Sequence, residues 1–534
     1  MLYRLPLLLV PLILSLAADA QSQWVWAKTD AAVSYNINPS YPRQVIAAHN
    51  GHALWGVIQN RKMTYGQVML GDYRLYDYDA SGNIGASTLI TGKVSLTAAR
   101  ADPAGNWYIL GTFYDSIMLS NGMSLVRTAT GSEHFLLRLR AGTLVPDWIQ
   151  PVGDNYFCST DCFTIVHGNI VLPIDSSYGT AICWFSAATG ARSTMWSQTG
   201  RSYTSYIDGD EKGNIYLMGN CALSGGVNFN GTPSPPISSA HYPWYIARYH
   251  SNGQHHWHYW LTDITCMTRS FRLGGNNAVY LSGPLADSTT LGVHYFLKPS
   301  GFFNADFLFA RLDSNGSLIW AQQRPITSIA QGNLYFSSQF HMAAVDTTMY
   351  MFCETQGASA WGGGIATQTA NNRHNGTLVA YGQSGPAIWA GAIGATYSIA
   401  QHVASDGVDL WITGVGADST AIRFDSIGIP TSPGPYIPYL AKMRLKTPIT
   451  TGLISRGKAA APVTVWPNPA KTVLHIRSAT PQQLSIRDLT GRFMWRGQMQ
   501  STSAQVETSA WPRGWYLLES GGSEDRWLTK VLLD

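Results

Sequence analysis

The chain has 534 residues, more than one ordinary hydrophobic core serves, so several domains or one large repeat architecture is expected. Charged residues make up 12% of the sequence and aromatic residues another 12%, and there are 52 glycines, which excludes a protein built mainly of helices with charged faces and favours short strands joined by tight turns. The net charge of +4 is spread along the chain without a dense Lys/Arg run, which argues against a nucleic acid partner.

The first 20 residues predict a cleaved export signal. Arg4 precedes an apolar run from Leu5 to Ala17, and Ala18-Asp19-Ala20 is a small-x-small site with cleavage expected before Gln21. The run is shorter than a membrane-spanning helix needs and contains two prolines, so we expect a signal peptide and no membrane span in the mature chain. The mature protein is therefore expected in an oxidising compartment.

Cysteine spacing leaves the redox chemistry open. The first two cysteines are close enough for a local bridge, and the other four either pair or are small buried residues. No second Cys-x-x-Cys supports a zinc site. The six are Cys158, Cys162, Cys183, Cys221, Cys266 and Cys353.

A repeat unit is clearest from Asp210 to Trp257. It consists of a Gly/Asn turn, a strand with an aromatic residue, a variable loop, a strand that ends in Arg or Lys, a second turn and a strand with Trp. Its first half recurs at residues 102–111 and its second half at 309–321. The turns need Gly or Asn because tight hairpins place residues at positive φ.

The residue aligned in the first predicted strand recurs seven times, at an average spacing of about sixty residues, which is a propeller-like or array-like period. We therefore predict seven units, with six or eight as alternatives because the third copy lacks the aromatic residue. The aligned residues are Trp55, Tyr108, Val171, Tyr216, Tyr280, Tyr350 and Trp411.

The last unit lacks its closing strand. Five earlier units end on a strand with Trp, but residues 440–444 run directly into Lys446-Thr447-Pro448. A matching segment, Gln23-Trp24-Val25-Trp26-Ala27, stands at the mature N-terminus. We expect it to complete the last unit, because a closed ring removes the exposed edges of an open array.

These units resemble bacterial propeller repeats that read roughly Asp-x-x-Gly-Asn-x-Tyr-x-x-Gly, then aliphatic-Ala-Arg/Lys-aliphatic, then Asn-Gly and Trp-Ala. The resemblance covers about residues 23–447 and implies an all-β fold, a β-propeller closed by the N-terminal strand. It implies no particular function, since propellers have many.

Residues 448–462 are expected to be a flexible linker, because Thr, Gly, Ser, Lys and Ala replace the aromatic residues there. Residues 463–534 then alternate in short strands and predict a small β-sandwich.

This tail resembles the type A C-terminal sorting domain of the type IX secretion system, also called the Por secretion system. The resemblance rests on an Asn-Pro-Ala motif, a Leu-x-Ile-x-Asp strand, a Gly-Arg turn, a Gly-x-Tyr strand and a final Thr-Lys strand. It implies passage through the periplasm, binding to the secretion machinery, and release or attachment at the cell surface. The motif residues are Pro467, Asn468, Pro469, Gly491, Arg492, Gly514, Tyr516 and Lys530.

Two clusters are candidate metal ligands. Asp208 and Asp210 offer closely spaced carboxylates for calcium, but an Asp in a turn more often bonds its own backbone. His256 and His258 would share one face of a strand and offer two imidazoles to zinc or copper, although no third ligand is evident. No other cofactor is predicted.

No local catalytic motif is present: there is no Gly-x-Ser-x-Gly elbow, His-Glu-x-x-His helix or phosphate loop. The leading hypothesis is a secreted or surface-attached binding protein for glycan or protein ligands, which would use variable loops and exposed Tyr and Trp. The alternative is a secreted polysaccharide hydrolase or lyase on the same scaffold, with two carboxylates about 5 to 10 Å apart. The residues that line the central channel would distinguish the two hypotheses.

Overall fold

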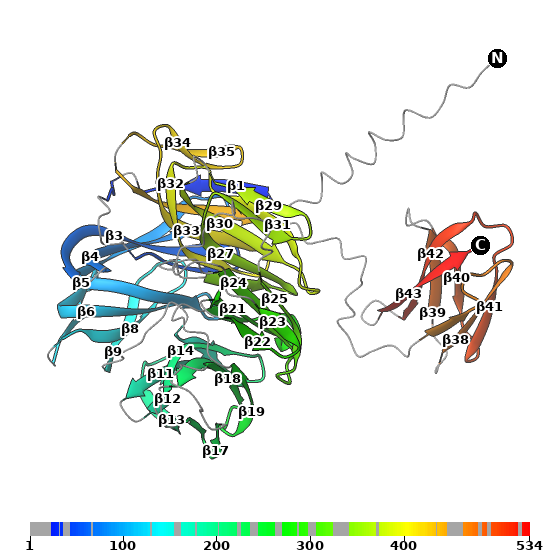
Figure 1. Cartoon of the computed structure of the whole chain (residues 1–534), viewed down its shortest axis with the longest axis horizontal. Coiled ribbons are helices and arrows are strands. Elements are labelled where there is room, and N and C mark those ends of the chain that lie inside the picture. The colour runs from blue at the N-terminus through cyan, green and yellow to red at the C-terminus, as the bar shows by residue number, and fades with distance from the viewer. Residues whose placement is uncertain are drawn as a thin grey trace. The chain divides into compact units, whose positions relative to one another are not determined.

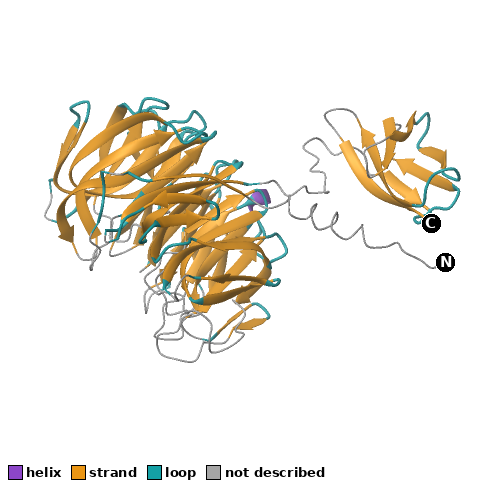
Figure 2. Ribbon diagram, turned by 90° about the horizontal axis from the view of Figure 1, so that it is seen from above, coloured by secondary structure: helices purple, strands orange, loops and turns teal. Residues whose placement is uncertain are grey.

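The computed structural model describes the chain except residues 1–22, 31, 36–42, 66–67, 129–130, 154–161, 177–178, 201, 222–225, 235–243, 262–269, 286–287, 297–305, 324–340, 370–372, 434, 446–462, 479–482, 489–492 and 522–525. The predicted signal peptide and linker thus lie outside the described residues. Contacts divide the chain into two units, one of Gln21–Leu445 and one that contains Lys446–Asp534. We call them the body and the C-terminal domain. Both are built of strands, as predicted (Figures 1 and 2).

The described strands of the body form antiparallel groups of four (Figure 1). The first two groups form one continuous sheet, because β5 pairs with β4 through its first part and with β6 through its last part. Their strands are β2 (Val45–His49), β3 (His52–Tyr65), β4 (Val68–Tyr78), β5 (Ile84–Ala101), β6 (Trp107–Leu119), β8 (Glu133–Leu139) and β9 (Pro146–Gly153).

The next groups follow the same order of four consecutive main strands. They are β10 (Thr164–Val166), β11 (Asn169–Ser176), β12 (Gly179–Ser186) and β13 (Arg192–Thr199); β14 (Ser202–Gly209), β15 (Ile215–Cys221), β18 (Trp244–Tyr249) and β19 (His255–Leu261); β20 (Ser270–Leu273), β21 (Val279–Leu285), β24 (Asp306–Leu312) and β25 (Leu318–Gln323); and β26 (His341–Val345), β27 (Thr348–Gln356), β30 (His374–Tyr381) and β31 (Ala387–Ala392).

Short elements stand between or beside the main strands. They are β7 (Ser124–Val126), β16 (Asn228–Phe229), β17 (Thr232–Pro233), the 3-10 turn η1 (Gly275–Asn277), β22 (Thr289–Leu291), β23 (His294–Phe296), β28 (Ala358–Gly362), β29 (Ile365–Gln368), β34 (Ala421–Phe424) and β35 (Ile427–Pro430).

The last group is completed from the other end of the chain. Its order is β32 (Tyr397–Ser405), β33 (Asp409–Ala417), β36 (Ile437–Arg444) and β1 (Gln23–Lys28). β1 pairs antiparallel with β36, from Gln23 opposite Arg444 to Lys28 opposite Leu440. This is the pairing that the sequence predicted for the N-terminal strand.

Each unit has one strand more than the repeat pattern predicts. The aligned aromatic residues lie in the second strand of a group, for example Tyr216 in β15, and a further strand precedes them. Two of these strands are short runs of mainly small and apolar residues, Val-Ile-Ala-Ala-His in β2 and His-Met-Ala-Ala-Val in β26. Three consecutive residues are buried at the start of both, so the alternating pattern of a half-exposed strand is absent.

The recurring Trp residues connect one group to the next. The indole Nε1 of Trp148 in β9 donates to the carbonyl oxygen of Ala187, in the turn after β12, at 3.2 Å. Trp257 and Trp320 donate in the same way to turns of the following groups, at 3.0 and 2.9 Å. These bonds, and the packing of each ring on a turn glycine, define what we call the seams between groups.

The seam between the last and first groups has the same form. Trp26 of β1 donates Nε1–H to the carbonyl oxygen of Ala80 in the turn between β4 and β5, at 3.1 Å, and its ring lies on Gly82. Lys442 of β36 donates to the same oxygen at 3.0 Å. One buried cluster includes Trp26, Trp55 and Trp411, so residues of the first and last groups share a core.

The C-terminal domain has its own core in two sheets. The strands are β37 (Val463–Trp466), β38 (Val473–Ser478) and β41 (Ser503–Glu507) in one sheet, and β40 (Phe493–Gln498), β39 (Gln483–Asp488), β42 (Gly514–Gly521) and β43 (Arg526–Leu533) in the other. No helix among the described residues is both long and apolar enough to cross a membrane.

Candidate functional site

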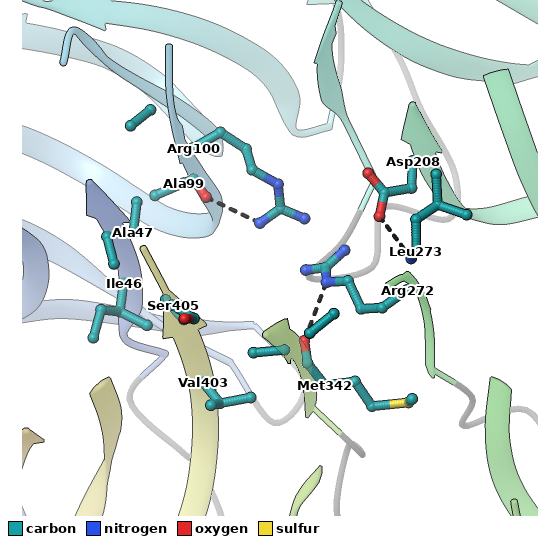
Figure 3. Close-up of a pocket in the computed structure, with 15 residues that line it drawn as sticks. Ile46, Ala47, Ala99, Arg100, Asp208, Arg272, Leu273, Met342, Val403 and Ser405 are labelled. Atoms are coloured by element: carbon teal, nitrogen blue, oxygen red, sulfur yellow. Dashed lines mark hydrogen bonds between the residues drawn. The ribbon is translucent and has the colours of Figure 1, made fainter. Parts of the chain in front are cut away.

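A cavity of about 270 Å³ lies where the first strands of six groups meet (Figure 3). Strands β2, β5, β14, β20, β26 and β32 each contribute residues to its wall. We call it the central pocket. Six strands from distant parts of the sequence thus converge on a single volume.

In each group, one residue of the first strand pairs with the residue of the second strand that repeats along the sequence, such as Trp55 or Tyr108. These seven first-strand residues occupy equivalent positions in their groups. Six of the seven equivalent residues line the pocket, and the seventh, Thr164, donates its hydroxyl to one of them, Asp208, at 3.4 Å. The seven are Ile46, Arg100, Thr164, Asp208, Arg272, Ala343 and Ala404. Three of these seven positions carry a charge, although charged residues are only 12% of the chain.

Arg100 is held at the end of β5. One terminal nitrogen donates to the carbonyl oxygen of Ala99 at 3.1 Å. The guanidinium carbon lies 5.8 Å from the centre of the ring of Phe163, which is fully buried. A cation over an aromatic face is stabilised by the ring quadrupole, so the guanidinium is oriented by the ring and the carbonyl together.

Arg272 and Asp208 belong to neighbouring groups. Arg272 donates Nε–H to the carbonyl oxygen of Met342 at 3.1 Å. One carboxylate oxygen of Asp208 accepts the backbone N–H of Leu273 at 3.1 Å, which places that carboxylate beside the strand of Arg272. Figure 3 shows both guanidinium groups pointing into the pocket and toward one another.

The described wall of the pocket therefore has two positive charges and one negative charge. Its remaining side chains are mainly alanines with Ile46, Met342, Leu273 and Val403, and Ser405 adds a hydroxyl. No Tyr or Trp is among the described lining residues. Both guanidinium groups are engaged by other parts of the protein, which holds their charges at this wall.

The two aspartates predicted as a calcium pair have different roles. The buried carboxylate of Asp210 accepts the backbone N–H of Lys212 at 3.0 Å and that of Asn214 at 2.9 Å, and also the Asn214 side-chain amide at 2.7 Å. Asp102 closes its own turn with the same bonds. Asp210 is thus a turn residue, whereas Asp208 lines the central pocket.

His256 and His258, which were predicted as a pair of metal ligands, contact different residues. A β-bulge between β18 and β19 leaves His256 without a direct partner in the strand register. His258 Nδ1 lies 3.3 Å from Nε2 of His255, and both rings stack on Phe229. His256 lies instead against His250, with its Nδ1 3.0 Å from a nitrogen of Arg248.

Burial lowers the pKa of His255 to about 4, with the neighbouring His258 and His256 as further causes. Burial also lowers the pKa of His256 and of His258. Neutral imidazoles are able to bind metals. Within the described part of the chain, however, no group of three or more His, Cys, Asp or Glu side chains lies together as a metal site.

The motif residues of the C-terminal domain fasten its last strand. The side-chain oxygen of Asn468 accepts the backbone N–H of Leu532 at 2.8 Å, and Ala470 exchanges backbone bonds with Leu532 and Asp534. Tyr516 is buried and donates its hydroxyl to the carbonyl oxygen of Pro512 at 2.6 Å. Pro467, Pro469 and Gly514 belong to described parts of the backbone, and Lys530 of β43 pairs with Leu517 of β42. Gly491 and Arg492 lie outside the described residues.

The repeat pattern does not predict Arg100 and Arg272 as residues of a site. Both stand two residues before the turn that opens the aligned strand, as Asp208 does before Asp210. The residues at this offset differ between copies, whereas the turn itself repeats. A comparison of the copies at that offset would have identified the three charges.

The family model for the secretion system C-terminal sorting domain matches residues 464–534. No match was found among curated proteins.

Three similar solved structures contain propellers, and all are remote. PorZ, a bacterial surface component of the type IX secretion system of Porphyromonas gingivalis, is 9% identical over 94% of this chain and 82% of its own, with a TM-score of 0.23. The WD40 domain of Toxoplasma gondii coronin is 9% identical over 79% and 87%, with a TM-score of 0.37. Prolyl oligopeptidase B of Galerina marginata is 9% identical over 88% of this chain and 58% of its own, with a TM-score of 0.38.

The described strands of the body form an all-β scaffold of antiparallel groups. Residues 464–534 are a type IX secretion system sorting domain, and the protein is a cargo of that system, secreted or attached at the cell surface.

Proposed function

We propose that residues 21–447 form a closed seven-bladed β-propeller that binds an extracellular ligand in its central pocket without altering it chemically. The proposed chain order is a signal peptide at 1–20, this propeller, a linker at 448–462 and the sorting domain. The pairing of β1 with β36 and the Trp26 seam support closure. The seven equivalent positions at the centre support the blade number.

The composition of the pocket wall supports ligand binding over catalysis. A glycosidase of the common kind needs two carboxylates that flank the scissile bond. Asp208 is the one carboxylate among the described lining residues, and two arginines accompany it. Fixed cations on a largely alanine wall favour recognition of a ligand over hydrolysis.

The exposed Tyr and Trp platforms of the sequence hypothesis receive less support. The recurring Trp side chains are occupied in the seams, where Trp148 and Trp196 are buried. Among the described residues of the body, Tyr295 in the β22–β23 hairpin is an aromatic side chain with large exposure, at 65%. The central pocket is therefore the better candidate for the binding site.

The test incubates the mature protein with polysaccharides and peptides from the cell exterior and measures both retention and products. We expect retention of at least one polymer or fragment with no new reducing ends, unsaturated sugar products or peptide fragments. Accumulating products that disappear in the D208N variant would establish the hydrolase or lyase alternative.

A second test concerns export. A chain without residues 463–534 is expected to fold and to stay in the periplasm, because the sorting domain is the part that addresses the secretion machinery. Cell fractionation with immunoblotting measures this. Full-length levels of the shortened chain in the medium would contradict it.

A further inference from the structure

We propose that His255 and His258 of β19 bind a tetrahedral divalent metal ion, such as Zn²⁺, through Nε2 of His255 and Nδ1 of His258. Water or a donor atom of a ligand completes the coordination. Both residues are half-buried and stand on the fourth strand of their group, whereas first strands line the central pocket. This site is therefore independent of the proposed binding function.

A β-bulge brings the two side chains to one face of the sheet. His255 pairs with Tyr249 and His258 pairs with Ala247, and His256 is the extra residue of the bulge. Tyr249 and Ala247 are two residues apart in β18 and so share a face. Their partners share that face too, although residues three apart in a regular strand point to opposite faces.

The distance between the two ring nitrogens fits a tetrahedral ion. Nδ1 of His258 lies 3.3 Å from Nε2 of His255. Two nitrogens bound to a tetrahedral ion at about 2.0 to 2.1 Å lie about 3.3 to 3.4 Å apart, whereas neighbouring ligands of a square-planar ion lie about 2.9 Å apart. One ring donates an N–H to the other across this distance. For both nitrogens to bind a metal, the donor ring has to carry its proton on its other nitrogen.

Both imidazole rings are held in place by the β16–β17 hairpin. The ring of Phe229 stacks on both imidazoles, with its centre 5.5 Å from that of His255 and 4.7 Å from that of His258. Asn230 donates its side-chain amide to the carbonyl oxygen of Gly253 at 2.7 Å, which fastens the hairpin to the turn between β18 and β19. Ligands that are already oriented lose little side-chain freedom on binding.

A second pair of histidines beside this one is less suited to a metal. The rings of His250 and His256 lie 4.8 Å apart, but a guanidinium nitrogen of Arg248 lies 3.0 Å from Nδ1 of His256. A fixed cation at that distance repels a metal ion. The described ring contacts of His255 and His258 are, by contrast, with uncharged aromatic rings and with one another.

The two groups that follow along the chain have no histidine at the corresponding positions. The same bulge stands one residue before the Trp of each of their outer strands, and the corresponding residues are Leu318 with Ala321, and Ala387 with Ala390. These side chains pack against buried apolar clusters. The fold therefore does not require imidazoles at this place, which supports a role for them beyond packing.

The experiment titrates the metal-free mature chain with Zn²⁺, by calorimetry and by competition with a chromophoric chelator, and records the visible spectrum of the Co²⁺ form. The test variants are H255L and H258A, which introduce the residue types that the next group has at these positions. The double variant H250Q/H256Q is the matched control, because it removes the same number of imidazoles from the same hairpin. Melting curves without metal establish that each variant is folded.

We expect zinc to bind at least about tenfold more weakly to H255L and to H258A, and with unchanged affinity to the control. Loss of even an outer-shell partner of a metal ligand costs about 10- to 100-fold in affinity, so loss of a ligand should cost no less. Zinc should raise the melting temperature of the unsubstituted protein and of the control, but not that of either test variant. Co²⁺ should give the intense visible absorption of a four-coordinate ion. If a test variant does not fold, H255Q or H258Q replaces it.

Three results would overturn the inference: no zinc binding at about 100 μM, full affinity in both test variants, or a loss of binding in the control alone. A weak, six-coordinate Co²⁺ spectrum would overturn the tetrahedral assignment. Ligand retention by the central pocket is measured without added metal, so a failure of either proposal leaves the other intact.

Discussion

The seams between groups and the centre of the body differ in how similar the residues at equivalent positions are from one group to the next. At the seams the same contact recurs: a Trp indole donates to a turn carbonyl of the next group, as Trp148, Trp257 and Trp320 do. At the centre the equivalent positions carry Ile, Arg, Thr, Asp or Ala. Repetition thus marks what joins the groups, and variation marks the positions that face the central pocket.

The difference has a physical basis. A seam has few solutions, because each Trp ring packs on a turn that has glycine at positive φ. The indole N–H of Trp196 has no acceptor among the described residues, so the packing of the ring is the shared feature. The pocket wall faces solvent-accessible space, so its side chains do not need to fill a core. The comparison therefore predicts large stability effects at the seams and small ones at the centre.

The largest expected effect is the loss of the N-terminal strand. A mature chain that begins at Ala31 loses Trp24 and Trp26, each only 7% exposed, together with the pairing to β36. Each Trp buries about 150 to 250 Å², so the loss is several kcal/mol at about 25 cal/mol per Å². Thermal unfolding against the chain that begins at Gln21 measures it, and equal melting temperatures would refute the closing role of β1.

The next effect concerns Lys442, which is fully buried. Its Nζ lies 2.6 Å from the carboxylate of Asp409 and donates to the Ala80 carbonyl. K442M leaves Asp409 with Arg444 alone, and we expect a loss of about 3 kcal/mol in the free energy of unfolding. Denaturant titration measures the change.

R311M is the matched control for K442M. Arg311 also donates to a seam carbonyl, that of Gln383, and lies over Tyr280, but no buried carboxylate depends on it in the described structure. We expect a loss of about 1 kcal/mol for this variant. Equal losses in the two variants would show that the last seam is no different from the others.

The next prediction is that the stability of the body depends on pH through Glu354 in β27. Burial raises the pKa of Glu354 to about 8, although its carboxyl accepts the N–H of Ala400. Between about pH 5 and 8 the unfolded chain ionises this group while the folded chain keeps it protonated, so stability falls by up to about 1.4 kcal/mol per pH unit.

The E354Q variant isolates this effect. It remains neutral and should lose less stability than the unsubstituted protein as the pH rises from 5 to 8. Unfolding curves at three pH values give the difference. A parallel decline in both proteins would mean that Glu354 is ionised in the folded state.

The seams were predictable from sequence and the pocket was not. The fixed spacing of Trp, Gly and Arg predicted the repeat, because these residues follow local rules for turns and buried aromatic side chains. The same spacing showed that the last unit lacks its closing strand and that the segment with Trp26 matches it. The proximity of Arg100, Asp208 and Arg272 could not be predicted from a local sequence pattern, because it depends on how three separate groups are arranged in space. His256 and His258 make different contacts because a bulge at His256 interrupts the alternation of side chains along the strand.

The smallest expected effect is at the pocket itself. The positions equivalent to Arg272 are Ala343 and Ala404 in the next two groups, so the fold already accepts alanine there. R272A should therefore change the free energy of unfolding by about 0.5 kcal/mol or less, within the usual range for substitutions that remove no buried core. Denaturant titration beside W148A, expected to lose about 3 to 5 kcal/mol, checks this. A loss in R272A that approaches the W148A value would mean that Arg272 holds the fold together, and the contrast between seam and centre would then disappear.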